Sequence, residues 1–118
     1  MTSQRVVFTL VALSLIIAAS VLAYADCPHD TATVQSLRDC VTHAAAEGHI
    51  DTAGITKSLL AKLDAAQAAV DRGQPAVAIN HLEAFIHEVQ AQAGKHIDAE
   101  HAAHLVEHAN RVIQALSE

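Results

Sequence analysis

Three histidines near the C-terminus have the spacing of a metal-binding helix face. His101, His104 and His108 stand at positions i, i+3 and i+7, which the 100° per residue of an α-helix places within about 60° of arc. Imidazole nitrogens bind Zn²⁺, Cu²⁺ and Ni²⁺, and His104 with His108 could chelate one ion, with His101 or Glu100 as a further ligand. Relative to the apolar stripe of this helix we expect all three to lie on a flank, outside the core, and the alternative to metal binding is a solvated, titratable face.

The two cysteines, Cys27 and Cys40, suggest two kinds of chemistry. Cysteines of an exported chain form a disulfide by default. A fully helical path would hold their Cα atoms about 20 Å apart, so a bridge requires residues 28–32 to fold back along the following helix. With His29 and His43, the same cysteines form the patterns Cys-x-His and Cys-x-x-His. These provide four ligands of the types that zinc accepts. We predict an intramolecular disulfide, with an intermolecular one and a zinc site as alternatives.

A catalytic mechanism does not emerge from the sequence. Ser58 and Ser117 have no His/Asp partner that spacing reveals, and Glu83 and Glu88 are expected to be solvated. With both cysteines assigned to a disulfide, nucleophilic catalysis has no candidate. An enzyme needs an acid, a base and a nucleophile in defined roles, so we expect a noncatalytic protein. Zn, Cu or Ni are the only cofactors that the sequence suggests.

The first 25 residues have the composition of a signal peptide. Residues 1–5 carry one basic side chain, residues 6–22 are almost wholly apolar, and Ala23-Tyr24-Ala25 fits an A-x-A cleavage site. Cleavage would leave 93 of the 118 residues, beginning at Asp26, in a secreted or periplasmic protein. The alternative is an uncleaved membrane anchor, because about 17 to 20 apolar residues approach the length that crosses a bilayer.

The mature chain is acidic and rich in histidine. Without Arg5 it has six Lys/Arg against thirteen Asp/Glu, a formal charge of −7 with neutral histidines. Binding to nucleic-acid phosphates therefore lacks an electrostatic basis, and we expect no nucleic-acid partner. Histidine ionises near pH 6.5, so protonating all nine histidines would move this charge from −7 to +2.

Four helical segments must position these residues. Abundant alanine with Leu, Ile and Val, few glycines and few β-branched runs predict an all-α protein. Helix-stop glycines and capping residues place the helices at about 33–47, 53–72, 75–93 and 99–116. Expected N-caps are Thr31 or Thr33, Asp51 or Thr52, and Asp98. Short connections favour an antiparallel, up-down bundle in which the last three helices form the compact unit.

The second and third segments form the hairpin around which the fold is organised. Their apolar residues recur with helical period, and their junction contains a C′ glycine followed by a proline at the first helical position. We expect the structurally important positions to be Leu59, Leu63, Gly73, Pro75, Leu82, Phe85 and Gly94.

Five short sequences in this region carry a family resemblance. They are DTAGI (51–55), SLLAKL (58–63), DRGQ (71–74), AINHLEAFI (78–86) and QAGKHI (92–97). Together they make residues 33–116 similar to the FIMAH domain, "found in many hydrolases". The resemblance implies a small helical module, usually appended to exported hydrolases, with no catalytic residues to carry over.

The predicted organisation is thus a signal peptide (1–25), an irregular lead-in (26–32) and a FIMAH-like bundle (33–118) that stands almost alone. The predicted function is an exported binding or interaction module for a protein or a cell-surface or extracellular ligand. An exported histidine-rich metal-binding protein is the alternative.

Overall fold

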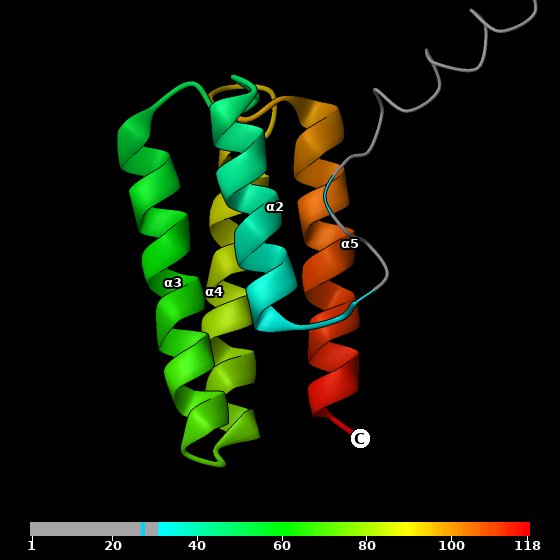
Figure 1. Cartoon of the computed structure of the whole chain (residues 1–118). Coiled ribbons are helices and arrows are strands. Elements are labelled where there is room, and N and C mark those ends of the chain that lie inside the picture. Colours follow the sequence, from blue (N-terminus) through cyan, green and yellow to red (C-terminus); the bar gives the residue numbers. More distant parts are fainter. Residues whose placement is uncertain (1–26, 28–30) are drawn as a thin grey trace, which may run out of the picture.

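The computed structural model describes Cys27 and residues 31–118, which form four α-helices (Figure 1). These are α2 (Val34–Ala46), α3 (Ala53–Asp71), α4 (Pro75–Gln92) and α5 (Ala99–Leu116). The predicted all-α class and the up-down bundle are confirmed. The predicted signal peptide and His29 lie outside the described residues.

The helices close into a ring. Helix α2 packs against α3 and α5, and α4 packs against the same two helices. The α2–α3 and α4–α5 connections meet at one end of the bundle, and the α3–α4 turn lies at the other (Figure 1). Leu37 and Val41 of α2 are fully buried. Helix α2 is therefore a full member of the bundle and not a brace on a three-helix unit.

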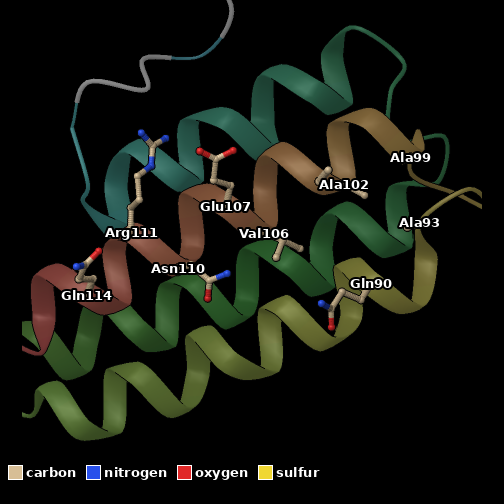
Figure 2. A pocket seen from close by; sticks show the side chains of 10 residues that line it. Gln90, Ala93, Ala99, Ala102, Val106, Glu107, Asn110, Arg111 and Gln114 are labelled. Carbon is tan, nitrogen blue, oxygen red and sulfur yellow. The ribbon is translucent and has the colours of Figure 1, made fainter.

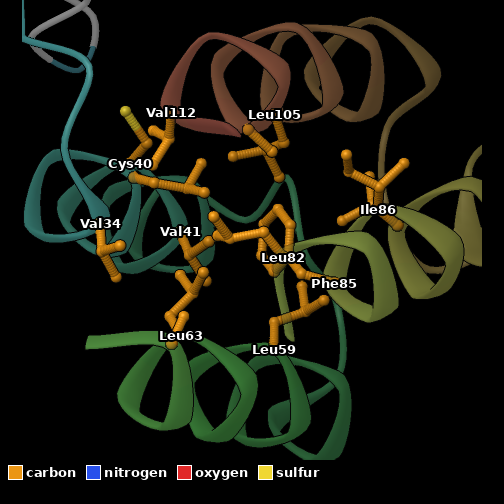
Figure 3. Close-up of a cluster of buried hydrophobic side chains, with 14 of the residues drawn as sticks. Val34, Cys40, Val41, Leu59, Leu63, Leu82, Phe85, Ile86, Leu105 and Val112 are labelled. Atoms are coloured by element: carbon orange, nitrogen blue, oxygen red, sulfur yellow. The ribbon is translucent and has the colours of Figure 1, made fainter. Parts of the chain in front are cut away.

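Among the described residues, the buried hydrophobic side chains are aliphatic apart from Cys40 and one phenylalanine, Phe85. Figure 3 shows Leu82 and Phe85 of α4 pointing into the space between the other helices. Leu59 and Leu63 of α3 close this space from one side, and all four side chains are 0% exposed. The buried residues of the four helices form one contiguous cluster. Four of the positions that the sequence marked as structural are thus central to the core.

The α3–α4 turn has the predicted geometry. Gly73 adopts a φ of 71°, in the left-handed region that favours glycine. Its amide donates to the carbonyl of Val70, and the amide of Gln74 donates to that of Ala69, each at 2.9 Å. Pro75 occupies the first position of α4, where its missing N–H costs no helical hydrogen bond. One helix therefore ends and the next begins within a few residues.

Helix α2 begins with a reciprocal cap. Thr33, not Thr31, is the N-cap: its Oγ1 accepts from the Ser36 amide at 3.0 Å. The Thr33 amide in turn donates to Ser36 Oγ at 3.2 Å, which completes a capping box. Helix α3 begins after Thr52, not Asp51, and Thr52 makes no side-chain capping hydrogen bond.

Candidate functional site

A disulfide joins Cys27 to Cys40, with their Cα atoms 4.9 Å apart. The predicted intramolecular bridge is therefore confirmed, and the intermolecular alternative is wrong. Because both sulfur atoms are bonded to each other, neither is a thiolate, which is the form that binds zinc. The bridge holds Cys27 against the middle of α2.

His108 lies in the core beside this disulfide. Its side chain is 1% exposed, with Nε2 2.9 Å from Ser36 Oγ and 3.1 Å from the Thr31 carbonyl oxygen. Its Nδ1 lies 3.4 Å from Cys40 Sγ. The expectation that His108 stands outside the core is wrong, because Thr31 and two residues of α2, Ser36 and Cys40, contact its ring.

The contacts of His108 define a structural Ser–His pair. The Thr31 carbonyl can only accept, so a proton on Nε2 satisfies both oxygens that face this nitrogen. Ser36 Oγ also donates to a backbone carbonyl, of Thr31 or of Thr33. Ser36 is 5% exposed, so its hydroxyl is enclosed and held by the backbone. This pair fixes the lead-in to α5 and offers no open nucleophile.

The other two histidines of the predicted metal face have different surroundings. His104 is exposed and His101 is half-buried. With His43 and His108 they line a small cavity of about 40 Å³ between α2 and α5, next to the disulfide. In the described part of the chain, however, the groups of three residues whose donor atoms lie within 4.8 Å of one another do not include the predicted set of His101, His104 and His108. These three histidines lie along the same α2–α5 interface, but their donor atoms do not converge on one point.

A repeated tripeptide closes the end of the bundle where the two longer connections meet. Residues 49–51 and 96–98 both read His-Ile-Asp, and they pair as an antiparallel bridge through the buried Ile50 and Ile97. The amide of each aspartate donates to the carbonyl of the opposite histidine, at 3.0 Å in both directions. We call these two stretches the paired His-Ile-Asp segments.

The side chains of the paired His-Ile-Asp segments also match in pairs. His49 Nδ1 lies 2.7 Å from Asp98 Oδ2, and His96 Nδ1 lies 2.8 Å from Asp51 Oδ1. Since a carboxylate accepts, each imidazole donates from Nδ1. Asp98 occupies the predicted N-cap of α5 but makes no side-chain capping hydrogen bond, because its carboxylate faces His49.

His101 joins one of these two pairs. Its ring stacks on that of His49, with centroids 3.5 Å apart and planes 14° from parallel. Donor atoms of His49, Asp98 and His101 all lie within 4.8 Å of one another. Sequence reasoning placed His101 with its neighbours on α5, and the structure places it with residues of the two connections.

A shallow groove runs along α4 and α5 on the outside of the bundle (Figure 2). Its volume is about 580 Å³. Small side chains form its apolar part: Ala93, Ala99, Ala102, Ala103 and Val106. Its polar lining consists of three amides, from Gln90, Asn110 and Gln114, and two charged side chains of α5, Glu107 and Arg111. The groove combines a surface that permits close approach with several hydrogen-bonding groups.

The comparison with known families matches the whole bundle. The model of the FIMAH domain fits residues 34–114, which span all four helices nearly to the end of α5. The chain belongs to the FIMAH family. FIMAH domains are noncatalytic accessory modules of hydrolases. No curated protein and no solved structure matches the chain.

One polar cluster of this FIMAH bundle corrects the expectation that Glu88 is solvated. The Glu88 side chain is only 16% exposed. Its Oε2 accepts from Ser58 Oγ at 2.7 Å and from Lys62 Nζ at 3.2 Å. The cluster links α3 to α4, and sequence spacing did not reveal it because the partners lie on different helices.

The described helices of the FIMAH bundle include none that is both long and apolar enough to cross a membrane.

Proposed function

We propose that this FIMAH domain is an exported, noncatalytic module that acts by binding a partner through its surface. The observation that carries the proposal is the family match, which covers the whole bundle. Accessory modules of hydrolases contribute binding and not chemistry, and the enclosed Ser36–His108 pair agrees with such a role. The partner is a protein or a cell-surface or extracellular ligand.

Two observations support export. The N-terminal 25 residues carry the pattern of a signal peptide, and Cys27 is bridged to Cys40. Disulfides persist in secreted and periplasmic proteins and are rare in reducing compartments. Expression of the whole chain, followed by N-terminal sequencing of the exported protein, tests this step. We expect a mature terminus at Asp26, whereas an intact N-terminus in the membrane fraction would mean an anchor.

The α4–α5 groove is the face that we propose for binding. Its alanines let another chain approach the helix backbones closely, and its three amides can both donate and accept hydrogen bonds. The lining also carries one carboxylate, Glu107, and one guanidinium, Arg111, so groups of both charges are available to a polar partner. Figure 2 shows the labelled side chains of the groove along α5 and on the neighbouring α4.

A matched pair of substitutions tests this face. Ala103 is exposed and lines the groove, whereas Ala91 is exposed on α4 and does not line it. Immobilised mature protein is exposed to the extracellular fraction of its own source, and bound molecules are identified by mass spectrometry. We expect one discrete partner with the natural protein and with Ala91→Glu, and its loss with Ala103→Glu. Equal retention by both variants would contradict the assignment of the groove.

A separate experiment tests the proposal that the domain is noncatalytic. The purified mature protein is incubated with model ester, peptide and glycoside substrates. We expect no turnover above a heat-denatured sample. Turnover that one point substitution, for example Ser58→Ala, abolishes would overturn the proposal.

Metal binding is the second candidate function. The specific observation in its favour is the gathering of four histidines, His43, His101, His104 and His108, around one cavity between α2 and α5. Calorimetric titration with Zn²⁺, Cu²⁺ and Ni²⁺ tests it, with His104→Ala as the variant that removes one of the two exposed members. Failure of every ion to bind more tightly than about 10 μM would exclude this function.

A further inference from the structure

We infer that His49, Asp98 and His101 form a binding site for one divalent transition-metal ion, at the bundle end where the α2–α3 and α4–α5 connections meet. The inference deepens the metal-binding candidate above and rests on it for the class of ligand. It differs in the residues, since only His101 is shared with the histidine flank of α5.

The three side chains come together from separate parts of the chain. His49 lies in the α2–α3 connection, Asp98 is the N-cap of α5, and His101 stands in the first turns of that helix. One donor atom from each lies within 4.8 Å of the other two. Two ligand nitrogens on one tetrahedral ion are roughly 3.3 Å apart, given bonds of about 2.0–2.1 Å. The donor atoms are therefore near the separation that one ion requires, although the imidazole rings must still be reoriented to bind it.

The backbone beneath the site is already fixed. The Asp98 amide donates to the His49 carbonyl, and the Asp51 amide donates to the His96 carbonyl. Ile50 and Ile97, which lie between these residues, are buried in the core. A site built on held segments loses little entropy when an ion binds, which favours affinity.

The site is open to an ion from solvent. A hollow of about 430 Å³ is lined by His49, Asp98 and His101 together with Glu100 and Lys95. The His49 and Asp98 side chains are 32% and 60% exposed. Two carboxylates against one ammonium give the hollow a negative balance. Two imidazoles with one carboxylate favour Zn²⁺, Cu²⁺ or Ni²⁺ over Mg²⁺ or Ca²⁺, which prefer oxygen ligands.

The ion has to separate the two stacked rings. The lone pair of an imidazole nitrogen lies in the ring plane, and the two planes are 14° from parallel at a centroid distance of 3.5 Å. Both nitrogens cannot point at one ion in that arrangement, so one ring must turn. Binding should therefore change the environment of both histidines, a signature that a loosely bound surface ion does not produce.

The molecule contains its own control. His96 and Asp51 repeat the chemistry of His49 and Asp98 in the opposite half of the paired His-Ile-Asp segments, with a similar side-chain separation. In the part of the chain that the structure describes, this second pair is not a member of any three-donor group. His96→Ala therefore removes an equivalent imidazole without removing a proposed ligand.

The experiment is a calorimetric titration of the disulfide-bonded mature protein with Zn²⁺ and, separately, with Ni²⁺. We expect one ion per chain, at least tenfold weaker binding for His49→Ala and for His101→Ala, and a change of less than twofold for His96→Ala. Circular dichroism confirms that each variant is folded. In long-range ¹H–¹⁵N spectra of the histidine rings, the ion should shift the signals of His49 and His101 and leave those of His96 in place.

Three outcomes would overturn the inference. Loss of binding in His104→Ala but not in His49→Ala would place the ion on the α5 flank, so the metal-binding function would survive and this site would not. Equal weakening by His96→Ala and His49→Ala would show nonspecific uptake by exposed histidines. The absence of any binding would remove both the site and the metal-binding candidate.

Discussion

His49 and Asp98 are joined twice, once by a backbone hydrogen bond of 3.0 Å and once through their side chains at 2.7 Å. The carboxylate of Asp98 would ordinarily cap α5, but it makes no hydrogen bond to the amides of that helix. It holds the α2–α3 connection instead. The residue that begins the last helix thus also closes the end of the bundle.

Replacing Asp98 by alanine should lower the free energy of unfolding by about 1 kcal/mol, because it removes the partly exposed side-chain hydrogen bond to His49. Asp98→Asn keeps an oxygen acceptor for the His49 Nδ1–H group, so it should recover most of this loss. Urea denaturation measures both. An alanine variant as stable as the natural protein would show that the His49–Asp98 side-chain contact contributes nothing.

Removing the disulfide should have a larger effect. In the chain-entropy model, a loop with a sequence separation of 13 gives about 3 kcal/mol of stabilisation. The double variant Cys27→Ser/Cys40→Ser should lose about this amount in urea denaturation, and reduction of the natural protein should give the same midpoint. A loss below about 1 kcal/mol would mean that the contacts of the lead-in hold it without the bridge.

His108 should behave as a core residue. His108→Ala empties a buried site and removes the hydrogen bonds to Ser36 and to the Thr31 carbonyl, so we expect a loss of about 2–3 kcal/mol. His104 is exposed on the same helix, and His104→Ala should change stability by less than about 0.5 kcal/mol. Equal effects of the two substitutions would contradict the burial of His108.

Two glycines should respond in opposite directions to substitution by alanine. Gly73 has a φ of 71°, which an L-residue adopts at a cost of about 1 kcal/mol. Gly54 lies in the first turn of α3, and the space that an added Cβ would occupy is open, so Gly54→Ala should stabilise by about 0.5–1 kcal/mol. Thermal unfolding distinguishes the two, and a stabilising Gly73→Ala would contradict the turn geometry.

The helices and their ends were largely predictable because local chemistry determines them. Gly73 and Pro75 define a junction through their own backbone preferences, whatever packs around them. The period of the apolar residues likewise identified Leu59 and Phe85 as core. Residues close in sequence are enough to determine such features. The resemblance to FIMAH likewise rests on short sequence motifs.

The site was less predictable because it depends on contacts between distant segments. Helical spacing groups His101 with His104 and His108, but His108 is enclosed by contacts with Ser36 and the Thr31 carbonyl, which the period of α5 cannot reveal. His101 meets His49 only because two connections arrive at the same end. One signal was present in the sequence: the tripeptide His-Ile-Asp occurs at 49–51 and again at 96–98, with an apolar residue between polar ones, as in a bridge.

In this ring, the first and the last of the four described helices are also packing neighbours. Each helix has two neighbours, because α5 packs beside α2, and the C-terminus lies at the same end of the bundle as the beginning of α2 (Figure 1). A short linker across that end could join α5 to α2, and the chain could then be opened at the α3–α4 turn with all four interfaces intact. Circular permutation is thus compatible with this architecture.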